Sequence, residues 1–115
     1  MGKSIFLDFM GDSPTTRVLE FLIIGREFDY CLTGIASNSK IGWTTLHRIF
    51  PSLEKREIVV PTRTIGRAKL YKLNQDSYSV KKLISLYDSL LGKELNEAEE
   101  KSKEKVMART EKTRR

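Results

Sequence analysis

The feature that most constrains the fold is the stretch over residues 42–73, in which a helical pattern is followed directly by two strand patterns. Between residues 43 and 55 the apolar side chains share one stripe about 100° wide, as on a helix that packs one face against a core. These side chains are Leu46, Ile49, Phe50 and Leu53. The β-branched segment 58–60 and the segment 68–73 then predict two strands joined by a turn. A chain with this pattern must place a helix next to a hairpin.

Two prolines and a glycine refine this expectation. Pro51 lies inside the predicted helix and removes one backbone hydrogen bond, at a cost of roughly 3 kcal/mol in a straight helix, so we expect a kink there and not a break. Pro61 has no N–H to donate, which places the first strand at an edge of the sheet. Gly66 can adopt a positive φ in the turn at residues 64–67.

A helix before this stretch is predicted from its start and stop signals. Ser13 can cap a helix, and Pro14 suits the first helical position, where no intrahelical hydrogen bond is lost. The helix should end near Gly25. Its apolar residues recur at helical spacing and include Val18, Leu19, Leu22 and Ile23. This helix is therefore expected at the centre of the core.

The segment between these two helices predicts a short strand and a short helix. Residues 28–31 read as an extended piece, and Thr33 is expected to cap the helix that follows. Residues 38–40 form the predicted turn, after which Gly42 opens the longer helix. This arrangement predicts a helix-turn-helix pair.

A fourth helix is predicted to begin near Ser79. It carries seven apolar residues among the twelve positions 80–91, which is more than one contact face requires. We therefore expect part of it to pack on the core and part on a second copy of the chain. The predicted dimer interface is formed by Leu83, Ile84, Tyr87, Leu90 and Leu91.

Together these elements predict an α+β, mostly helical chain. The expected architecture is a winged helix-turn-helix, with a three-helix core, a two-stranded wing and a C-terminal helix. Residues 1–92 form the predicted domain, and residues 93–115 a charged helical extension that frays toward its end.

The positive charge of the chain is concentrated in one region. Residues 40–82 contain ten Lys or Arg and three Asp or Glu, a net charge of +7, whereas the whole chain carries +6. A localised cationic zone suggests a polyanionic partner. A basic surface kept for solubility is the alternative.

Several classes of function lack support in the sequence. Cys31 and His47 are the single cysteine and histidine, so we expect neither a metal site nor a cofactor. The carboxylates show no spacing typical of a paired acid and base, which argues against an enzyme. No apolar run approaches the roughly 20 residues of a membrane span. A reducing, cytoplasmic setting in association with the nucleoid is expected.

The segments Ile35–Ala36, Thr44–Ile49, Leu53–Glu54 and Ile58–Val59 resemble a family of prokaryotic winged-helix transcription regulators, including small archaeal DNA-binding proteins. The architecture is similar to the MarR and ArsR types. The resemblance implies that the third helix enters the major groove of double-stranded DNA and that the wing lies on the minor groove or the backbone. The residues that it assigns to DNA are Ser39, Lys40, Gly42, Trp43, Thr44, Thr45, His47, Arg48, Arg63, Arg67 and Lys69.

Some positions depart from the family pattern. Lys40 stands where a turn glycine is usual, and Gly42 replaces the usual serine cap. Trp43 occupies a position that is often polar, where it can either stack on DNA or cover the edge of the core. Glu57 replaces a helix-ending glycine, and a left-handed conformation there would carry strain of about 1–2 kcal/mol.

The sequence therefore favours a sequence-dependent DNA-binding regulator that acts as a homodimer. Two alternatives stay open. One is a non-specific nucleoid or plasmid-segregation DNA-binding protein, and the other is a winged-helix module that binds other proteins.

Overall fold

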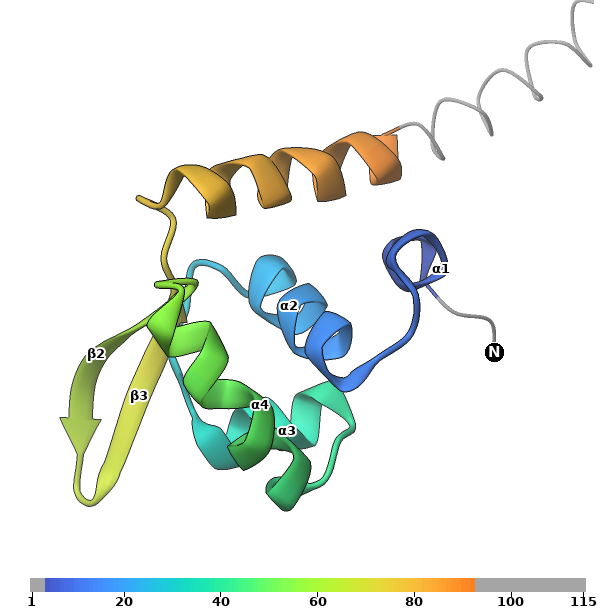
Figure 1. Cartoon of the computed structure of the whole chain (residues 1–115). Coiled ribbons are helices and arrows are strands. Elements are labelled where there is room, and N and C mark those ends of the chain that lie inside the picture. The colour runs from blue at the N-terminus through green and yellow to red at the C-terminus, as the bar shows by residue number, and fades with distance from the viewer. Residues whose placement is uncertain (1–3, 93–115) are drawn as a thin grey trace, which may run out of the picture.

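A computed structural model describes residues 4–92 of the chain, and the predicted extension over residues 93–115 lies outside the described residues. Four helices and a hairpin surround one core, and a long C-terminal helix crosses above them (Figure 1). The elements are α1 (Ile5–Met10), α2 (Pro14–Ile24), β1 (Tyr30–Cys31), α3 (Leu32–Ser39), α4 (Trp43–Lys55), β2 (Val59–Ile65) and β3 (Ala68–Leu73), followed by a C-terminal helix over residues 78–92. The predicted α+β winged-helix architecture is confirmed.

The start of α2 is held as the sequence predicts. The N–H of Thr16 donates to Ser13 Oγ at 3.2 Å, and the N–H of Ser13 donates to Thr16 Oγ1 at 2.9 Å, so the two residues cap each other. Pro14 occupies the first helical position. The helix ends at Gly25, where a side chain would collide with the ring of Tyr30.

Two predictions about the helices were incomplete or wrong. The short helix α1 was not foreseen, because six residues are too few to show a helical period; Ser4 caps it, and Phe6 is fully buried. Thr33 does not cap α3. The helix begins two residues earlier than predicted, at Leu32, and Cys31 precedes it without a side-chain cap.

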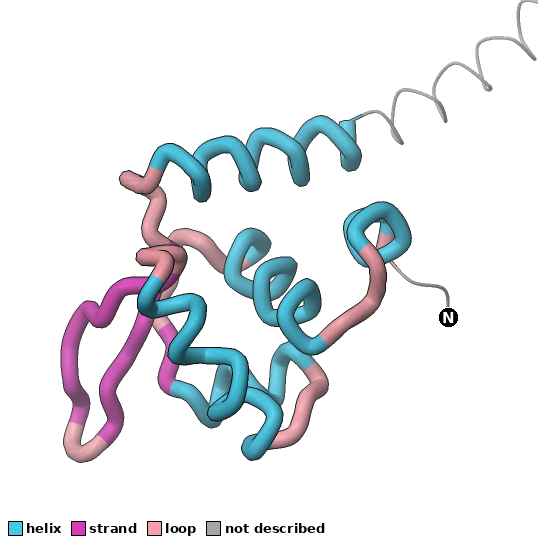
Figure 2. Tube along the Cα trace, viewed as in Figure 1, coloured by secondary structure: helices cyan, strands magenta, loops and turns pink. Residues whose placement is uncertain are grey.

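The strands form one antiparallel sheet in the order β1-β3-β2 (Figure 2). The β2–β3 hairpin is the predicted wing, and the short β1 adds a third strand through the pairs Tyr30–Tyr71 and Cys31–Leu70. As predicted, β2 is an edge strand, and its register shifts after Pro61. Gly66 has φ +61° in the turn, as its position required.

The helix α4 joins the hairpin to the core. Leu46, Phe50 and Leu53 are buried, and the helix continues through Pro51 without a break. The ring of Phe50 meets that of Tyr71 at a centroid distance of 4.8 Å. The other core residues come mainly from α2, α3 and β3, and include Val18, Leu22, Ile23, Ile35, Val59 and Leu73. No helix within residues 4–92 is long and apolar enough to cross a membrane.

Two residues without glycine's freedom adopt left-handed backbone conformations. Lys40, between α3 and α4, has φ +57°, and Glu57, between α4 and β2, has φ +56°. Both stand where glycine was expected, so the backbone geometry is kept although the glycines are absent. The C=O of Glu57 accepts a hydrogen bond from Asn74 Nδ2 at 2.9 Å, which holds this strained position.

Replacing Glu57 by glycine is expected to raise the free energy of unfolding by roughly 0.5–1 kcal/mol. The change relieves strain of about 1–2 kcal/mol, and the greater chain entropy of glycine offsets part of the gain. Urea unfolding followed by circular dichroism measures the difference. Glu54→Gly is the matched control, since it lies in α4 and should lower stability by about 1 kcal/mol. Equal destabilisation by both substitutions would contradict strain at Glu57.

Candidate nucleic-acid interface

The outer face of α4 is polar because its apolar stripe is turned toward the core. Thr44, His47 and Arg48 are exposed, and Thr45 is half-buried. No carboxylate is recorded in an ion pair or hydrogen bond with Arg48 within the described residues, so the guanidinium is available to a ligand. The face thus presents small hydroxyl groups and one cation together.

Trp43 lies at the start of this face. Half of its surface is exposed, and its ring meets that of His47 at a centroid distance of 4.2 Å in an edge-on arrangement. It is not part of the buried core cluster. The indole therefore adds an apolar, partly exposed surface at the N-terminal end of α4, next to the hydroxyl groups of Thr44 and Thr45.

The turn that leads into α4 is tied to the start of α2. Arg17 forms a two-pronged contact with Asp12, from Nε to Oδ1 at 2.7 Å and from Nη2 to Oδ2 at 2.9 Å. The same guanidinium donates through Nη1 to the C=O of Lys40 at 3.2 Å. Gly42 is the N-cap of α4 and supplies no side-chain cap, so the helix N-terminus is open to an anion.

The wing carries Arg63, Arg67 and Lys69, all exposed. Arg63 is held by Asp29, which the sequence did not indicate as a partner. The guanidinium donates to the carboxylate at 3.0 and 3.2 Å, and the hydroxyl of Thr62 donates to the same group at 2.5 Å. These hydrogen bonds, that from Arg63 above all, lower the pKa of Asp29 below its usual range. Arg63 is nevertheless 62% exposed.

Ser39 does not belong to this surface. We expected it to contact DNA, but it lies in the last turn of α3 and is only 5% exposed. Because α3 continues one residue past the predicted helix end at residue 38, Ser39 is helical and its side chain turns inward and not toward solvent. The other ten residues assigned to DNA lie on or next to α4 or on the wing.

The predicted dimer residues lie mainly against their own chain. Leu83, Ile84, Tyr87 and Leu90 are partly buried against the core cluster, and the ring of Tyr87 meets that of Phe6 at 5.5 Å. Leu91 is 39% exposed. The unforeseen α1 thus uses part of the apolar surface that suggested a second copy. Other large apolar side chains are exposed on α1 and at the end of α2, namely Phe9, Met10 and Ile24.

No group of three or more metal-binding side chains occurs in the part of the chain that the structure describes.

Burial raises the pKa of the Tyr87 hydroxyl, and the nearby negative charges of Glu20 and Asp88 raise it further. This places Glu20 close to the C-terminal helix.

No protein-family model matches the sequence. No curated protein matches it either. Solved structures do match in fold. The chain is similar to the transcriptional regulator HlyU from Vibrio vulnificus, with a TM-score of 0.53 and 21% identity over 75% of this chain and 83% of that one. It is also similar to MepR, a transcription regulator of the Staphylococcus aureus multidrug efflux pump MepA, with a TM-score of 0.59 and 17% identity over 93% and 80% of the two chains.

A third similar structure is the homodimeric winged helix-turn-helix DNA-binding domain of a possible ArsR-family transcriptional regulator from Mycobacterium bovis. Its TM-score is 0.54, with 16% identity over 81% of each chain. These likenesses establish a winged helix-turn-helix fold, as the sequence predicted.

Removing the carboxylate that holds the wing should loosen the hairpin. In Asp29→Asn the charged contact with Arg63 is lost, and we expect faster tryptic cleavage after Arg63 and Arg67. The measurement is limited proteolysis followed by mass spectrometry. Glu27→Gln, an exposed acidic residue two positions away, is the control and should leave the cleavage rate unchanged.

The same contact has a defined pH dependence. Because the folded-state pKa of Asp29 is lowered, its contribution to stability is present above the ordinary carboxyl pKa of about 4 and is lost as the pH falls through the lowered value. Below pH 4 the difference in melting temperature between the wild type and Asp29→Asn should therefore shrink. A constant difference down to pH 2 would contradict this role.

Proposed function

We propose that this protein is a transcription regulator that binds double-stranded DNA through α4 and the wing. The observation that carries the proposal is the polar, cation-bearing outer face of α4 beside an exposed cationic hairpin. In Figure 1 the beginning of α4 and the tip of the β2–β3 hairpin point toward the same lower edge of the view. A net charge of +7 over residues 40–82 supports a polyanionic partner.

The chemistry of the α4 face suits the major groove. A helix fits this groove, and its base edges offer a distinct pattern of donors and acceptors for each base pair. Arg48 can pair with guanine or a phosphate, and Thr44 and Thr45 can donate to phosphates or touch a thymine methyl group. The free N–H groups at the uncapped N-terminus of α4, after Gly42, can donate to a phosphate oxygen.

The wing is expected to lie along the adjacent backbone or minor groove. Arg67 and Lys69 are exposed on the hairpin, and the minor groove and the phosphates of DNA both attract such cations. Arg63 is positioned by Asp29, so we expect it to orient the hairpin as well as add positive charge. Its remaining exposure leaves room for a contact with a phosphate.

We further propose that the protein acts as a homodimer. The support is the set of exposed large apolar side chains on these helices, Phe9 and Met10 of α1, Ile24 of α2 and Leu91 of the C-terminal helix. Such side chains are typical of surfaces that bury on association. The similar domain from Mycobacterium bovis is described as homodimeric. A dimer would bring two α4 helices to half-sites about one helical turn apart.

Sequence-neutral DNA binding is a second candidate, favoured by the half-exposed Trp43 at the start of α4. An indole at a reading position can stack on sugar without selecting a base. Comparing the affinity for a site selected from a random library with that for unselected duplex distinguishes the two. A ratio near one favours the sequence-neutral alternative, and a ratio above about 10³ favours a regulator.

The test of the interface is Arg48→Ala. Removing this side chain should weaken DNA binding by about 5- to 100-fold, because a direct contact to a base or a phosphate contributes about 1–3 kcal/mol. Fluorescence anisotropy with a labelled duplex across a salt series measures the effect. Lys81→Ala removes the same charge from the exposed surface of the C-terminal helix and should change affinity much less. Equal losses of DNA affinity in the two variants would mean that Arg48 acts only through its charge and forms no direct contact with DNA.

The test of the dimer is the mass in solution. At micromolar concentrations light scattering should give twice the 13.2 kDa of one chain. Phe9→Glu should shift the mass toward the monomer, because it places a charge in the proposed interface. Tyr78→Glu, which alters an exposed aromatic residue at the other end of the C-terminal helix, should keep the dimer. A monomeric wild type would overturn this part of the proposal.

A further inference from the structure

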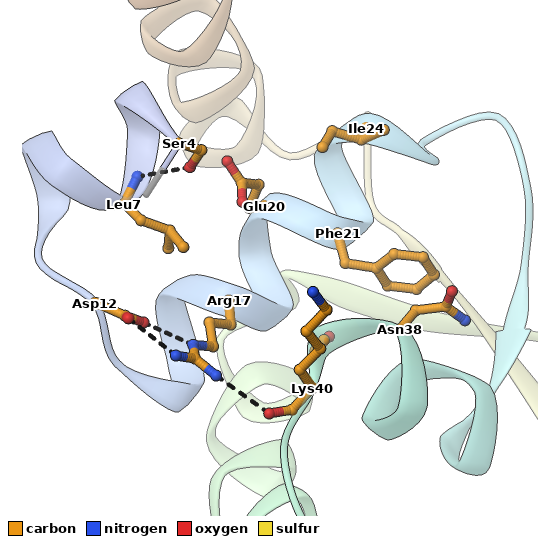
Figure 3. A pocket seen from close by; sticks show the side chains of 10 residues that line it. Ser4, Leu7, Asp12, Arg17, Glu20, Phe21, Ile24, Asn38 and Lys40 are labelled. Atoms are coloured by element: carbon orange, nitrogen blue, oxygen red, sulfur yellow. Dashed lines mark hydrogen bonds and ion pairs between the residues drawn. The ribbon is translucent and has the colours of Figure 1, made fainter. Parts of the chain in front are cut away.

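A cavity of about 490 Å³ opens between α1, α2 and the end of α3 (Figure 3). Leu7, Phe21 and Ile24 provide its apolar wall. The volume falls within the range of about 300–1,000 Å³ that is usual for small-molecule sites. Apart from Lys40, none of the residues that lie on or next to the candidate DNA interface lines this cavity.

Two polar atoms in the lining are buried without a partner. The hydroxyl of Ser39 belongs to a residue that is 5% exposed, and it has no hydrogen-bond partner among residues 4–92. Oε2 of Glu20 is likewise buried and unpaired within the same range. Buried polar groups in proteins are nearly always hydrogen-bonded, and exceptions need a specific explanation. A ligand that supplies the missing partners explains both.

The charges around the cavity define the ligand further. The guanidinium of Arg17 is already engaged by Asp12 and by the C=O of Lys40. The side chain of Lys40 extends into the cavity toward Glu20 in Figure 3, yet no ion pair between these two is recorded in the described part of the chain. A carboxylate and an ammonium group therefore both line the cavity beside its apolar wall.

From this arrangement we propose that the cavity binds a small apolar zwitterion, namely an α-amino acid with an aliphatic or aromatic side chain. Its ammonium group donates to Glu20, and its carboxylate accepts from Ser39 and Lys40. The apolar side chain lies against Phe21 and its neighbours. A simple amine would leave Lys40 and Ser39 without a partner, and a simple carboxylate would leave Glu20 unpaired and repel it.

The position of the cavity gives binding a route to α4. Ser39 and Lys40 form the last turn of α3 and the residue that redirects the chain into α4, and Lys40 holds its left-handed conformation beside the anchor from Arg17. A ligand held by these residues favours one geometry of that turn, and so changes how α4 is presented. This coupling to DNA rests on the proposed function, whereas the binding site itself does not.

The first experiment is calorimetric titration of the full chain, without DNA, with L-phenylalanine and L-leucine. Phenethylamine and 3-phenylpropionate serve as probes that each lack one charge. We expect at least one amino acid to bind with a dissociation constant below about 1 mM, and both single-charge probes to bind about tenfold more weakly or worse. Glu20→Gln and Lys40→Asn should each weaken amino-acid binding by about tenfold, and asparagine tolerates the left-handed backbone of residue 40.

Ser39→Ala distinguishes a loss of amino-acid binding from a general loss of folding. It removes a buried hydroxyl that has no partner, so melting of the free protein should not fall, yet amino-acid affinity should drop by about 3- to 10-fold. Glu27→Gln, outside the cavity, is the charge-matched control for Glu20→Gln and should bind normally. If neither amino acid binds at about 10 mM, the proposed site is wrong. If a single-charge probe binds as tightly as the amino acids, the proposal that the ligand is a zwitterion is wrong.

DNA affinity is then measured with and without saturating amino acid, in the wild type and in Glu20→Gln. At an amino-acid concentration that just saturates the wild type, we expect the DNA affinity of the wild type to change by at least about threefold and that of the more weakly binding variant to change less. Unchanged DNA affinity despite calorimetric binding would overturn the coupling and leave the site intact. Amino-acid binding by a protein that ignores DNA would instead refute the proposed function.

Discussion

The burial of the apolar stripe of α4 is the interaction on which the rest of the structure depends. Leu46, Phe50 and Leu53 enter the core, and the contact of Phe50 with Tyr71 joins the helix to the central strand of the sheet. This packing also decides the orientation of the opposite face. Since the hydroxyl groups and Arg48 are about half a turn away from the stripe, burying one set exposes the other, and the candidate interface follows directly from the core.

Polar contacts between separate segments fix the positions of the turn before α4 and of the wing, which core packing alone does not determine. Arg17, held in a fork by Asp12, anchors the turn before α4 through its hydrogen bond to the C=O of Lys40, and the fork between Asp29 and Arg63 anchors the wing. Both are partly exposed, and exposed ion pairs contribute little to overall stability. Their effect is one of position, because each joins a connecting segment to an element that the core already holds. The outer face of α4 and the hairpin are thereby kept in a fixed relation.

The cavity beside α2 lies where α1, α2 and the end of α3 meet. It is bounded by the helix that the sequence did not predict, by the central helix and by the residue that redirects the chain into α4. Ser39, assigned to the surface from sequence, faces this interior instead, and Glu20 joins it there. Buried groups that lack partners mark a place where the folded chain is incomplete by itself, whereas the polar groups on the outer face of α4 are open to solvent.

Local patterns alone determined the order of helices and strands, the edge position of β2, the cap of α2 and the polar face of α4, because helical and strand periods and proline or glycine geometry act over a few residues. They could not determine the short α1, the inward turn of Ser39, or the use of Leu83 and Tyr87 against the chain's own core. The pairing of Asp29 with Arg63, 34 positions apart, was equally invisible. These features arise only when distant segments meet, since burial and partner choice depend on what lies across the fold and not on neighbours in sequence.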